Sequence, residues 1–399
     1  MNGTKCAKKL LIIGASILQL PAIKLAKELG YYVGVIDYNP NAIGVPYADE
    51  FFNVSTIDID GVVKTAETFH PDGIMTLATD MPMRSIAAAC EKLGLCGISF
   101  ETAVKSTDKG EMIQAFEKSG VEHPWYYILS KPDELDGVIE KITFPCISKP
   151  TDNSGSRGVM LIHNEDELRE AVSYSSENGR SGGVIVEEYM SGPEVSVEII
   201  TLDGQPHVLQ VTDKLTTGAP HFVEMGHSQP SRLPACDVDK IKDLACRAVK
   251  SVGIQNGPAH VEIILTAGGP KMVELGARMG GDCITTHLVP LSTGVNMIEA
   301  TMRIACGETP DIEKKLNKGS AIRYFNPRAG LIKEIRGVEA ASEIQGIREI
   351  SFVKNVGDTV GSIGSSTDRA GFVIAQADTA DEAVRICEQA CEMIEIVTE

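Results

Sequence analysis

The first hundred residues alternate β-rich segments with amphipathic ones, and this alternation restricts the fold more than any other feature of the chain. The apolar, β-rich segments are predicted to be strands and cover residues 9–13, 32–36, 51–54 and 73–77. Helical periodicity covers residues 21–29 and 83–93. Successive β–α units form a parallel sheet with helices on both faces. We therefore predict a doubly wound α/β unit over residues 1–100.

The turn after the first predicted strand does not carry the dinucleotide-binding pattern. It reads Gly14-Ala15-Ser16-Ile17-Leu18-Gln19, whereas G-x-G-x-x-G requires two further glycines. Asp37 ends the second predicted strand, where a ribose-binding acid would lie. Because the glycines are missing, we do not expect a dinucleotide. The strand ends at Gly14, Asp37 and Asp80 are instead expected to face a crevice.

At 399 residues, the chain is too long for one ordinary hydrophobic core and suits two or three domains. Its composition changes near Glu101 and again in the polar stretch Pro310–Ser320. The elements predicted after Glu101 are a helix over residues 102–119, an α+β unit to about residue 190, a region dominated by strands to about residue 273, a helix near residues 297–305 and a closing helix at residues 380–394.

The chain is strongly acidic, with 37 basic and 55 acidic residues and a formal net charge of −18. This excess repels phosphate backbones and anionic lipids, so we expect neither nucleic acid nor a membrane as a partner. The apolar run Leu10–Leu18 is not followed by a cleavage pattern, and no apolar stretch reaches the length of a membrane span. The ten cysteines are scattered, which favours reduced thiols in a cytoplasmic protein.

Two lysines and one glycine-rich segment are candidates for binding phosphate. Lys109 is predicted at the start of a helix, after Ser106-Thr107-Asp108, and Lys149 ends the predicted strand Phe144–Ser148, where its charge requires an anionic partner. Residues 151–158 are small and glycine-rich, so their amides can fold over phosphate oxygens. The candidate residues in this loop are Ser154, Gly155 and Ser156. Taken singly, a solvent-directed lysine or an ordinary hairpin explains each feature as well.

A strand followed by acidic residues and a glycine turn spans residues 184–194. Backbone groups around Glu187–Met190 are placed to read an adenine edge. Glu194, after the turn, is placed to accept hydrogen bonds from ribose hydroxyls. This hairpin pattern alone is only moderately specific for a nucleotide.

Two glutamates on neighbouring predicted strands give the strongest indication of chemistry. Glu262 and Glu274 each interrupt an apolar run, and Gly268-Gly269-Pro270 joins the two runs. Buried carboxylates side by side repel each other unless cations hold them, and hard oxygen ligands favour Mg²⁺ or Mn²⁺. Arg278 follows on a glycine-rich turn, where it can stabilise a transferring phosphoryl group or an oxyanion. The alternative, solvent-facing acids on edge strands, does not explain why all four features occur in this order.

In this order, the four features resemble those of the ATP-grasp superfamily, from Leu10 to about Glu308. Residues 184–194 are similar to the adenine and ribose hinge of D-alanine–D-alanine ligases, and residues 261–307 to biotin carboxylase. The overall resemblance is greatest to carboxylate–amine ligases, including L-amino-acid ligases. It implies a Rossmann-like preATP-grasp domain (1–100), an ATP-grasp domain (101–310, with a lid subdomain at about 122–190) and a small C-terminal α+β domain (311–399).

The resemblance also implies roles for single residues. Those expected to act on ATP are Lys109 and Lys149 at the phosphates, Glu187, Glu188 and Met190 at adenine, and Glu194 at the ribose. Glu262 and Glu274 would bind the metal, and Arg278, with Lys149, would be catalytic. Many family members carry asparagine where this chain has Gly276, so a third protein ligand to the metal is in doubt.

The function implied is an ATP-dependent ligase that joins a small carboxylate to an amine through an acyl phosphate, with an amino-acid or dipeptide ligase as one form. The segment Lys214–Pro230 is where the resemblance to amino-acid ligases is clearest. The candidate substrate residues are His221, Glu224, His227 and Asp282. Asp282 also stands where biotin carboxylase has an acidic base, so an enzyme that uses bicarbonate or formate stays open. An ATP-binding module without activity would not need Arg278 or the two glutamates. The resemblance also admits a homodimer.

Overall fold

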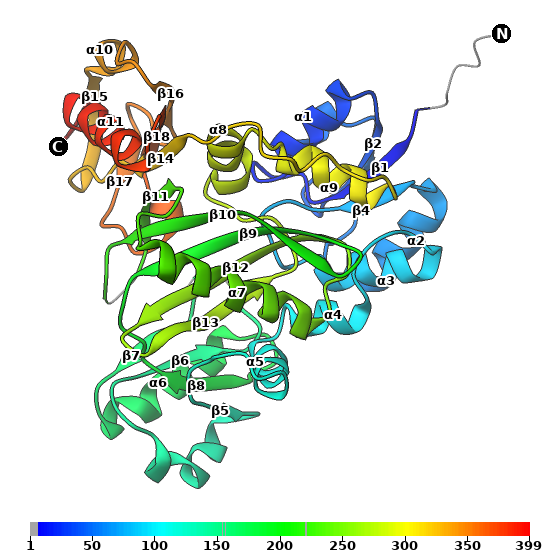
Figure 1. The fold of residues 1–399 in the computed structure, drawn as a ribbon, viewed down its shortest axis with the longest axis vertical. Coiled ribbons are helices and arrows are strands. Elements are labelled where there is room, and N and C mark those ends of the chain that lie inside the picture. Colours follow the sequence, from blue (N-terminus) through cyan, green and yellow to red (C-terminus); the bar gives the residue numbers. More distant parts are fainter. Residues whose placement is uncertain (1–6, 154, 156, 220–221) are drawn as a thin grey trace.

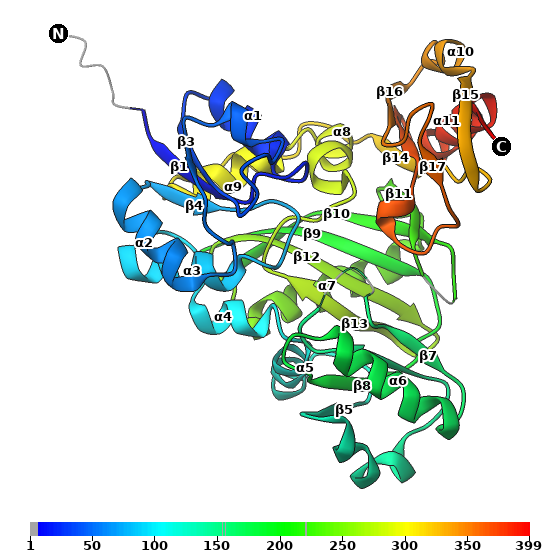
Figure 2. The same cartoon turned by 180° about the vertical axis from the view of Figure 1, so that it is seen from behind.

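The computed structural model describes residues 7–153, 155, 157–219 and 222–399, and these form a mixed α/β fold (Figure 1). A large central sheet carries the N-terminal unit and the C-terminal unit at opposite sides of one end, and a small sheet lies at the other end (Figure 2). None of the helices within the described residues has the length and apolar character needed to span a bilayer. The nine cysteines of this part are all free thiols.

The N-terminal unit is a parallel sheet with the strand order β3-β2-β1-β4. Its elements are β1 (Lys9–Ile13), α1 (Leu20–Glu28), β2 (Tyr32–Ile36), β3 (Glu50–Phe52), α2 (Ile59–Phe69), β4 (Gly73–Met75) and α3 (Met83–Leu93). The predicted doubly wound unit is therefore confirmed. Helix α2 was not predicted, although Asp58 caps its N-terminus by accepting a hydrogen bond from the Gly61 amide.

The single helix predicted over residues 102–119 is wrong, because the structure has two. Helix α4 (Phe100–Lys105) ends at Lys105, and three residues separate it from α5 (Lys109–Lys118). The Asp108 side chain accepts hydrogen bonds from the amides of Gly110 (2.9 Å) and Glu111 (3.1 Å) and so starts a new helix. This break makes Lys109 the first residue of α5.

A small antiparallel sheet, with the order β5-β8-β6-β7, forms the unit at the bottom of Figure 1. Its strands are β5 (Tyr126–Leu129), β6 (Cys146–Pro150), β7 (Met160–Ile162) and β8 (Val184–Glu188), and α6 (Glu165–Asn178) packs against it. We refer to residues 122–190 as the lid subdomain. Strand β6 pairs with both β7 and β8.

The central sheet is antiparallel, with the order β13-β12-β9-β10-β11-β14-β18-β16. Its strands are β9 (Glu194–Leu202), β10 (Gln205–Thr216), β11 (Glu224–Gln229), β12 (Gly257–Thr266), β13 (Gly269–Gly276), β14 (Gly319–Tyr324), β16 (Ile347–Phe352) and β18 (Gly371–Ala377). Three of these strands come from the predicted C-terminal domain, so the sheet continues across residue 310.

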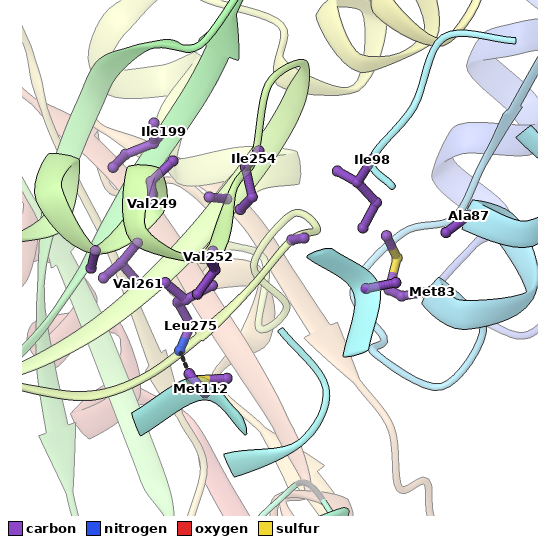
Figure 3. Packing of buried hydrophobic residues seen from close by; sticks show 14 of the residues in the cluster. Met83, Ala87, Ile98, Met112, Ile199, Val249, Val252, Ile254, Val261 and Leu275 are labelled. Carbon is purple, nitrogen blue, oxygen red and sulfur yellow. Dashed lines mark hydrogen bonds between the residues drawn. The ribbon is translucent and has the colours of Figure 1, made fainter. Parts of the chain in front are cut away.

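A long helix, α7 (Ala235–Val252), lies within the region where strands were predicted to dominate. Its apolar side chains recur at helical spacing and are buried against β9 and β12, which explains why it forms. Figure 3 shows Val249 and Val252 of α7 near Ile199 and Val261 of the sheet. Strands dominate the region up to residue 273, as predicted, but α7 within it was not predicted. Helix α7 covers the apolar face of this part of the central sheet. The opposite, more polar face of the sheet is available for a functional site.

The chain then returns to the N-terminal unit before it forms the C-terminal one. Helices α8 (Val289–Thr293) and α9 (Met297–Ala305) follow β13, and α9 packs beside α1 and β4 (Figure 1). The remaining elements are β15 (Gly330–Arg336), α10 (Val338–Ser342), β17 (Thr359–Val360), α11 (Ala380–Met393) and β19 (Glu395–Thr398). They enclose a separate apolar core with β14 and β18.

Candidate nucleotide-binding site

An apolar slot lies between the lid sheet and the central sheet. It is closed by α5 on one side and by β6, β8 and β13 on the others, and Lys109, Met112, Ile113, Phe116, Lys149, Ile185, Glu187, Met272 and Val273 line it. A second, more polar pocket adjoins the slot and shares Lys109 and Met112 with it. Figure 3 shows Met112 beside Leu275, whose amide donates to its sulfur at 3.3 Å. The two cavities therefore form one cleft with an apolar end and a charged end.

A buried ion pair lies at the apolar end of the cleft. Lys149 Nζ is 2.6 Å from Glu187 Oε1, and both side chains are less than a tenth exposed. Lys149 comes from β6 and Glu187 from β8, which are neighbours in the lid sheet. We expected a phosphate to balance Lys149, whereas in the structure a carboxylate does so. Because the two charges offset each other, the pair can be buried without a bound ligand. Lys149 already lines the slot.

Lys109 joins three segments around the boundary between slot and pocket. Its amine lies 3.0 Å from Glu274 Oε2 and donates to the backbone oxygen of Asn153 at 2.7 Å. Its amide donates to the Thr151 oxygen at 2.8 Å. Burial lowers the pKa of Lys109, but Glu274, Asp80 and Glu187 together raise it above its ordinary value. Lys109 is therefore a fixed cation at the start of the predicted phosphate loop.

Glu262 and Glu274 lie directly opposite each other on β12 and β13, as the sequence predicted. The expectation that cations lie beside this pair agrees with the structure, where protein cations flank both carboxylates. Lys214 Nζ is 3.0 Å and His260 Nε2 3.3 Å from Glu262, and Lys109 contacts Glu274. Burial raises the pKa of Glu262, but Lys214 and His260 hold it well below its ordinary value. Glu262 is therefore an ionised carboxylate.

This pair suits a magnesium ion only with help from a ligand. No group of three or more His, Cys, Asp or Glu side chains placed to hold a metal occurs among residues 7–153, 155, 157–219 and 222–399. Two carboxylates on adjoining strands are hard donors of the kind Mg²⁺ prefers, and Mg²⁺ takes its other ligands from phosphates and water. The residues present fit a metal that arrives with a nucleotide.

Arg278 is held by a carboxylate from the N-terminal unit. Its Nε and Nη2 donate to the two oxygens of Asp80, each at 2.9 Å, and Nη1 donates to the Met279 oxygen at 3.3 Å. Asp80 follows β4 and lines the polar pocket, so its predicted place at a crevice is confirmed. A Cβ atom on Gly276 would lie 2.6 Å from Asp80 Oδ1. The departure from asparagine at this position therefore makes room for the Asp80–Arg278 pair.

The remaining candidate nucleotide residues lie around the hinge between the two sheets. Glu188 on β8 accepts from Lys271 on β13 at 2.7 Å, and Met190 is buried. Glu194 contacts Lys214, and burial raises its pKa despite that contact. Of the predicted loop residues, Gly155 has a φ of 68° with open space around its Cα, which only glycine accommodates easily. Ser154 and Ser156 lie outside the described residues.

The candidate substrate residues form a second cluster beside β11. Glu224 Oε1 is 3.6 Å from Lys214, and buried His227 places Nε2 3.4 Å from Asp282 Oδ2. The Nδ1 atom of His227 is buried and has no hydrogen-bond partner among the described residues. Arg369 donates to both oxygens of Asp282, at 2.7 and 2.8 Å. His221 lies outside the described residues.

Arg369 changes the interpretation of Asp282 as a base. Burial raises the pKa of Asp282, but Arg369 and His227 hold it well below its ordinary range. A carboxylate with both oxygens occupied by a guanidinium is a poor proton acceptor. The guanidinium carbon of Arg369 lies 3.8 Å from the centroid of the Tyr324 ring. The C-terminal unit therefore holds Asp282 in place through Arg369. Neither residue was predicted, and nothing in the local sequence around them indicates this contact.

We predict that Arg369→Gln destabilises the protein by about 3–5 kcal/mol at neutral pH, because it leaves Asp282 buried without its partner. The pKa of Asp282 is lowered by folding, so its pairing stabilises fully above about pH 4 and is lost as the pH falls below that value. Urea unfolding at pH 7 and pH 3 measures both effects. The double variant Asp282→Asn/Arg369→Gln should lose much less than the sum of the two single variants. Additive losses would contradict the pairing.

Two family models match separate parts of the chain. An ATP-grasp domain matches residues 142–286, and an L-amino acid ligase C-terminal domain 2 matches residues 323–399. Alanine–anticapsin ligase of Bacillus subtilis is 27% identical over 323 residues, covering 75% of this chain and 67% of the relative. Phosphoribosylamine–glycine ligase of Methanocaldococcus jannaschii is 25% identical over 422 residues, covering 97% and 94%.

Solved structures agree over almost the whole chain. Phosphoribosylglycinamide synthetase from Anaerococcus prevotii has a TM-score of 0.81 at 26% identity, and L-amino acid ligase from Bacillus licheniformis 0.85 at 23% identity. Each alignment covers 99% of this chain and 100% of the other. The chain therefore contains an ATP-grasp domain and shares its overall fold with these enzymes. These relatives are ligases that form C–N bonds, and residues 323–399 of this chain match the C-terminal domain of L-amino acid ligases.

Proposed function

We propose that the chain is an ATP- and Mg²⁺-dependent ligase that activates the carboxylate of an amino acid and transfers the acyl group to an amine. The observation that carries this proposal is the single cleft that leads from the apolar slot, past Lys109, to Glu262, Glu274 and Arg278. An adenine ring fits the apolar end between the two sheets. The phosphates then extend toward the charged end.

Each cation and carboxylate of the cleft has a proposed role with the nucleotide. Lys149 binds phosphate at the slot, and Lys109 binds phosphate at the boundary, where it also orients Glu274. Backbone groups of Glu187–Met190, at the end of β8, bind the adenine edge, and Glu194 binds the ribose. Mg²⁺ held by Glu262 and Glu274 would neutralise phosphate charge. The division into domains at residues 100 and 310 is part of the same proposal.

The reaction follows from the position of Arg278 at the charged end. The substrate carboxylate attacks the γ-phosphorus in line, and ADP leaves, which gives an acyl phosphate. The amine then attacks the acyl carbon to give a tetrahedral intermediate, whose negative oxygen requires a donor. The bond from the acyl carbon to the phosphate oxygen then breaks, inorganic phosphate leaves, and the amine proton is lost to give the amide. Three of the five N–H groups of Arg278 are used by Asp80 and Met279, so two remain for the negative oxygen. Asp80 therefore orients Arg278 and leaves two of its N–H groups available as donors.

An amino acid is the substrate class that the second cluster favours. Glu224 lies on β11 beside Lys214 and offers a carboxylate for an ammonium group, and His227 lies on the same strand. The match of residues 323–399 to the C-terminal domain of L-amino acid ligases supports this choice. An enzyme that uses bicarbonate is the second candidate, because Asp282 occupies the position of an acidic base. The contact of Asp282 with Arg369 counts against that role.

Hydroxylamine should distinguish these candidates. With ATP, Mg²⁺ and the correct amino acid, an acyl phosphate is expected to be trapped as a stable hydroxamate while phosphate is released. A screen of amino acids for hydroxamate and for phosphate identifies the acid, with acid-free reactions as the control. If bicarbonate alone stimulates ATP hydrolysis and no amino acid yields a hydroxamate, the carboxylase function replaces the ligase.

The surroundings of the enzyme are part of the proposal. The net charge of −18 supports small-molecule partners and argues against nucleic acid and membranes. The free thiols of the described cysteines support a reducing compartment such as the cytoplasm. A homodimer is tested by light scattering of the purified protein.

A further inference from the structure

Arg180 differs from the other positively charged residues that line the polar pocket. Lys109 contacts Glu274 at 3.0 Å, and Arg278 contacts Asp80 at 2.9 Å. His260, the remaining basic residue, contacts Glu198 at 2.8 Å. The guanidinium of Arg180 instead contacts the thioether sulfur of Met81. Within the part of the chain that the structure describes, it forms no ion pair with a carboxylate.

The backbone of Arg180 is fixed to the predicted phosphate loop. Arg180 lies in the turn between α6 and β8, where its amide donates to Asp152 Oδ1 at 2.9 Å. The next amide, of Ser181, donates to Asp152 Oδ2 at 2.8 Å. Asp152 follows Thr151, the first residue after β6, whose backbone oxygen accepts a hydrogen bond from the Lys109 amide. Arg180 therefore lies at the same corner of the lid subdomain as Asp152, near the start of the predicted phosphate loop.

The side chain of Arg180 reaches from this corner across the pocket. Met81 belongs to the N-terminal unit, just before α3, and both residues line the polar pocket with Glu262, Glu274 and Arg278. A thioether is a weak hydrogen-bond acceptor, so an anion that enters the pocket can replace it at little cost. Recruiting Lys109 or Arg278 would instead require a change in an existing ion pair.

The charge of the pocket makes such a cation necessary. Four carboxylates line it, from Asp80, Asp152, Glu262 and Glu274, and its other cations are paired with them or with Glu198. A triphosphate brings further negative charge into this space. Mg²⁺ offsets part of it, and an arginine without a carboxylate partner offers planar, charged donors for phosphate oxygens.

We infer that Arg180 is a phosphate-binding residue that the lid subdomain contributes to the terminal phosphate of ATP. This inference rests on the proposed function. Arg180 lines the polar pocket but not the apolar slot, so it lies at the end of the cleft that is far from the adenine. The group that reaches this end is the γ-phosphate, and after its transfer the phosphate of the acyl phosphate.

Binding of two nucleotides to the full-length protein tests this role. We expect Arg180→Gln to raise the Kd of the Mg²⁺ complex of β,γ-imido-ATP at least about tenfold, and the Kd of Mg²⁺·ADP less than about twofold, because ADP lacks the terminal phosphate. Arg180→Lys should recover part of the loss, since it keeps the charge but not the planar donors. The matched control is Arg169→Gln on α6, whose exposed guanidinium contacts Asp136 at 2.6 Å. Isothermal titration calorimetry measures all four proteins.

The outcomes separate this inference from the proposed function. Wild-type protein that binds neither nucleotide would remove the ATP site and the role of Arg180 with it. Wild-type protein that binds both, with Arg180→Gln weakening both equally or neither, would overturn the role of Arg180 alone. Thermal melting checks that each variant is folded, and Arg180→Lys gives the same test if the glutamine variant is not.

Discussion

Replacing Glu274 with glutamine is expected to lower ATP turnover by at least about 10³-fold. A carboxylate ligand to a phosphate-bound metal is worth several kcal/mol of transition-state stabilisation, and each 1.4 kcal/mol corresponds to about tenfold in rate. The variant keeps the shape of the side chain on β13 but lacks the negative charge opposite Glu262. Steady-state phosphate release with saturating Mg²⁺ and ATP measures the loss.

The stability of the same variant tests the role of Lys109. Repulsion between Glu262 and Glu274 alone predicts that the metal-free protein becomes no less stable. In the structure Glu274 is the ion-pair partner of Lys109, so we expect the free energy of unfolding to fall by about 1–3 kcal/mol. Glu122→Gln is the control, because it breaks an exposed contact with Arg247 of 2.6 Å away from the cleft. Turnover of Glu274→Gln within tenfold of wild type would contradict the metal assignment.

Replacing Arg278 with lysine is expected to lower kcat by about 10²–10³-fold and to change the Kd of ATP by less than about threefold. A lysine keeps the charge, but it cannot contact both oxygens of Asp80 and still offer two fixed donors to an oxyanion. The adenine, ribose and metal contacts are proposed to lie elsewhere in the cleft. Initial rates with varied substrate and direct nucleotide titration separate the two quantities.

Arg303→Lys provides the matched comparison. Arg303 on α9 also donates through Nε and Nη2 to one carboxylate, that of Glu299, but it does not line the cleft. We expect its kcat to stay within about twofold of wild type. Equal losses in the two variants would mean that Arg278 acts through folding and not at the reacting atoms.

Features encoded in short, local patterns could be predicted from the sequence. The apolar run of β1 and the alternation that follows it specify a parallel sheet, because each element buries its own apolar residues. The pairing of Glu262 with Glu274 was predictable for the same reason, since a short glycine-containing turn fixes the register of β12 and β13. Helix α9 was predicted with its observed limits.

Contacts between distant residues could not be predicted. Arg278 and Asp80 are 198 positions apart, and Arg369 and Asp282 are 87 apart, so no local spacing brings either pair together. Helix α7 was missed because its apolar stripe is diluted by charged residues on the other face. Helices α4 and α5 were predicted as one helix because Asp108 fits the polar face of a continuous helix. Its role as the N-cap of α5 was not considered.

The continuity of the central sheet across residue 310 has a consequence for protein engineering. Strand β14 pairs with β11 from Gly226–Arg323 to Gln229–Ser320, and β11 carries His227 of the substrate cluster. A chain cut before β14 would expose the backbone groups of β11 as a free edge, which promotes aggregation. Chimaeras that exchange the C-terminal region between relatives should therefore transfer β11 together with β14. A junction placed upstream of Glu224 keeps this pair of strands from one parent, whereas a junction near residue 310 divides it.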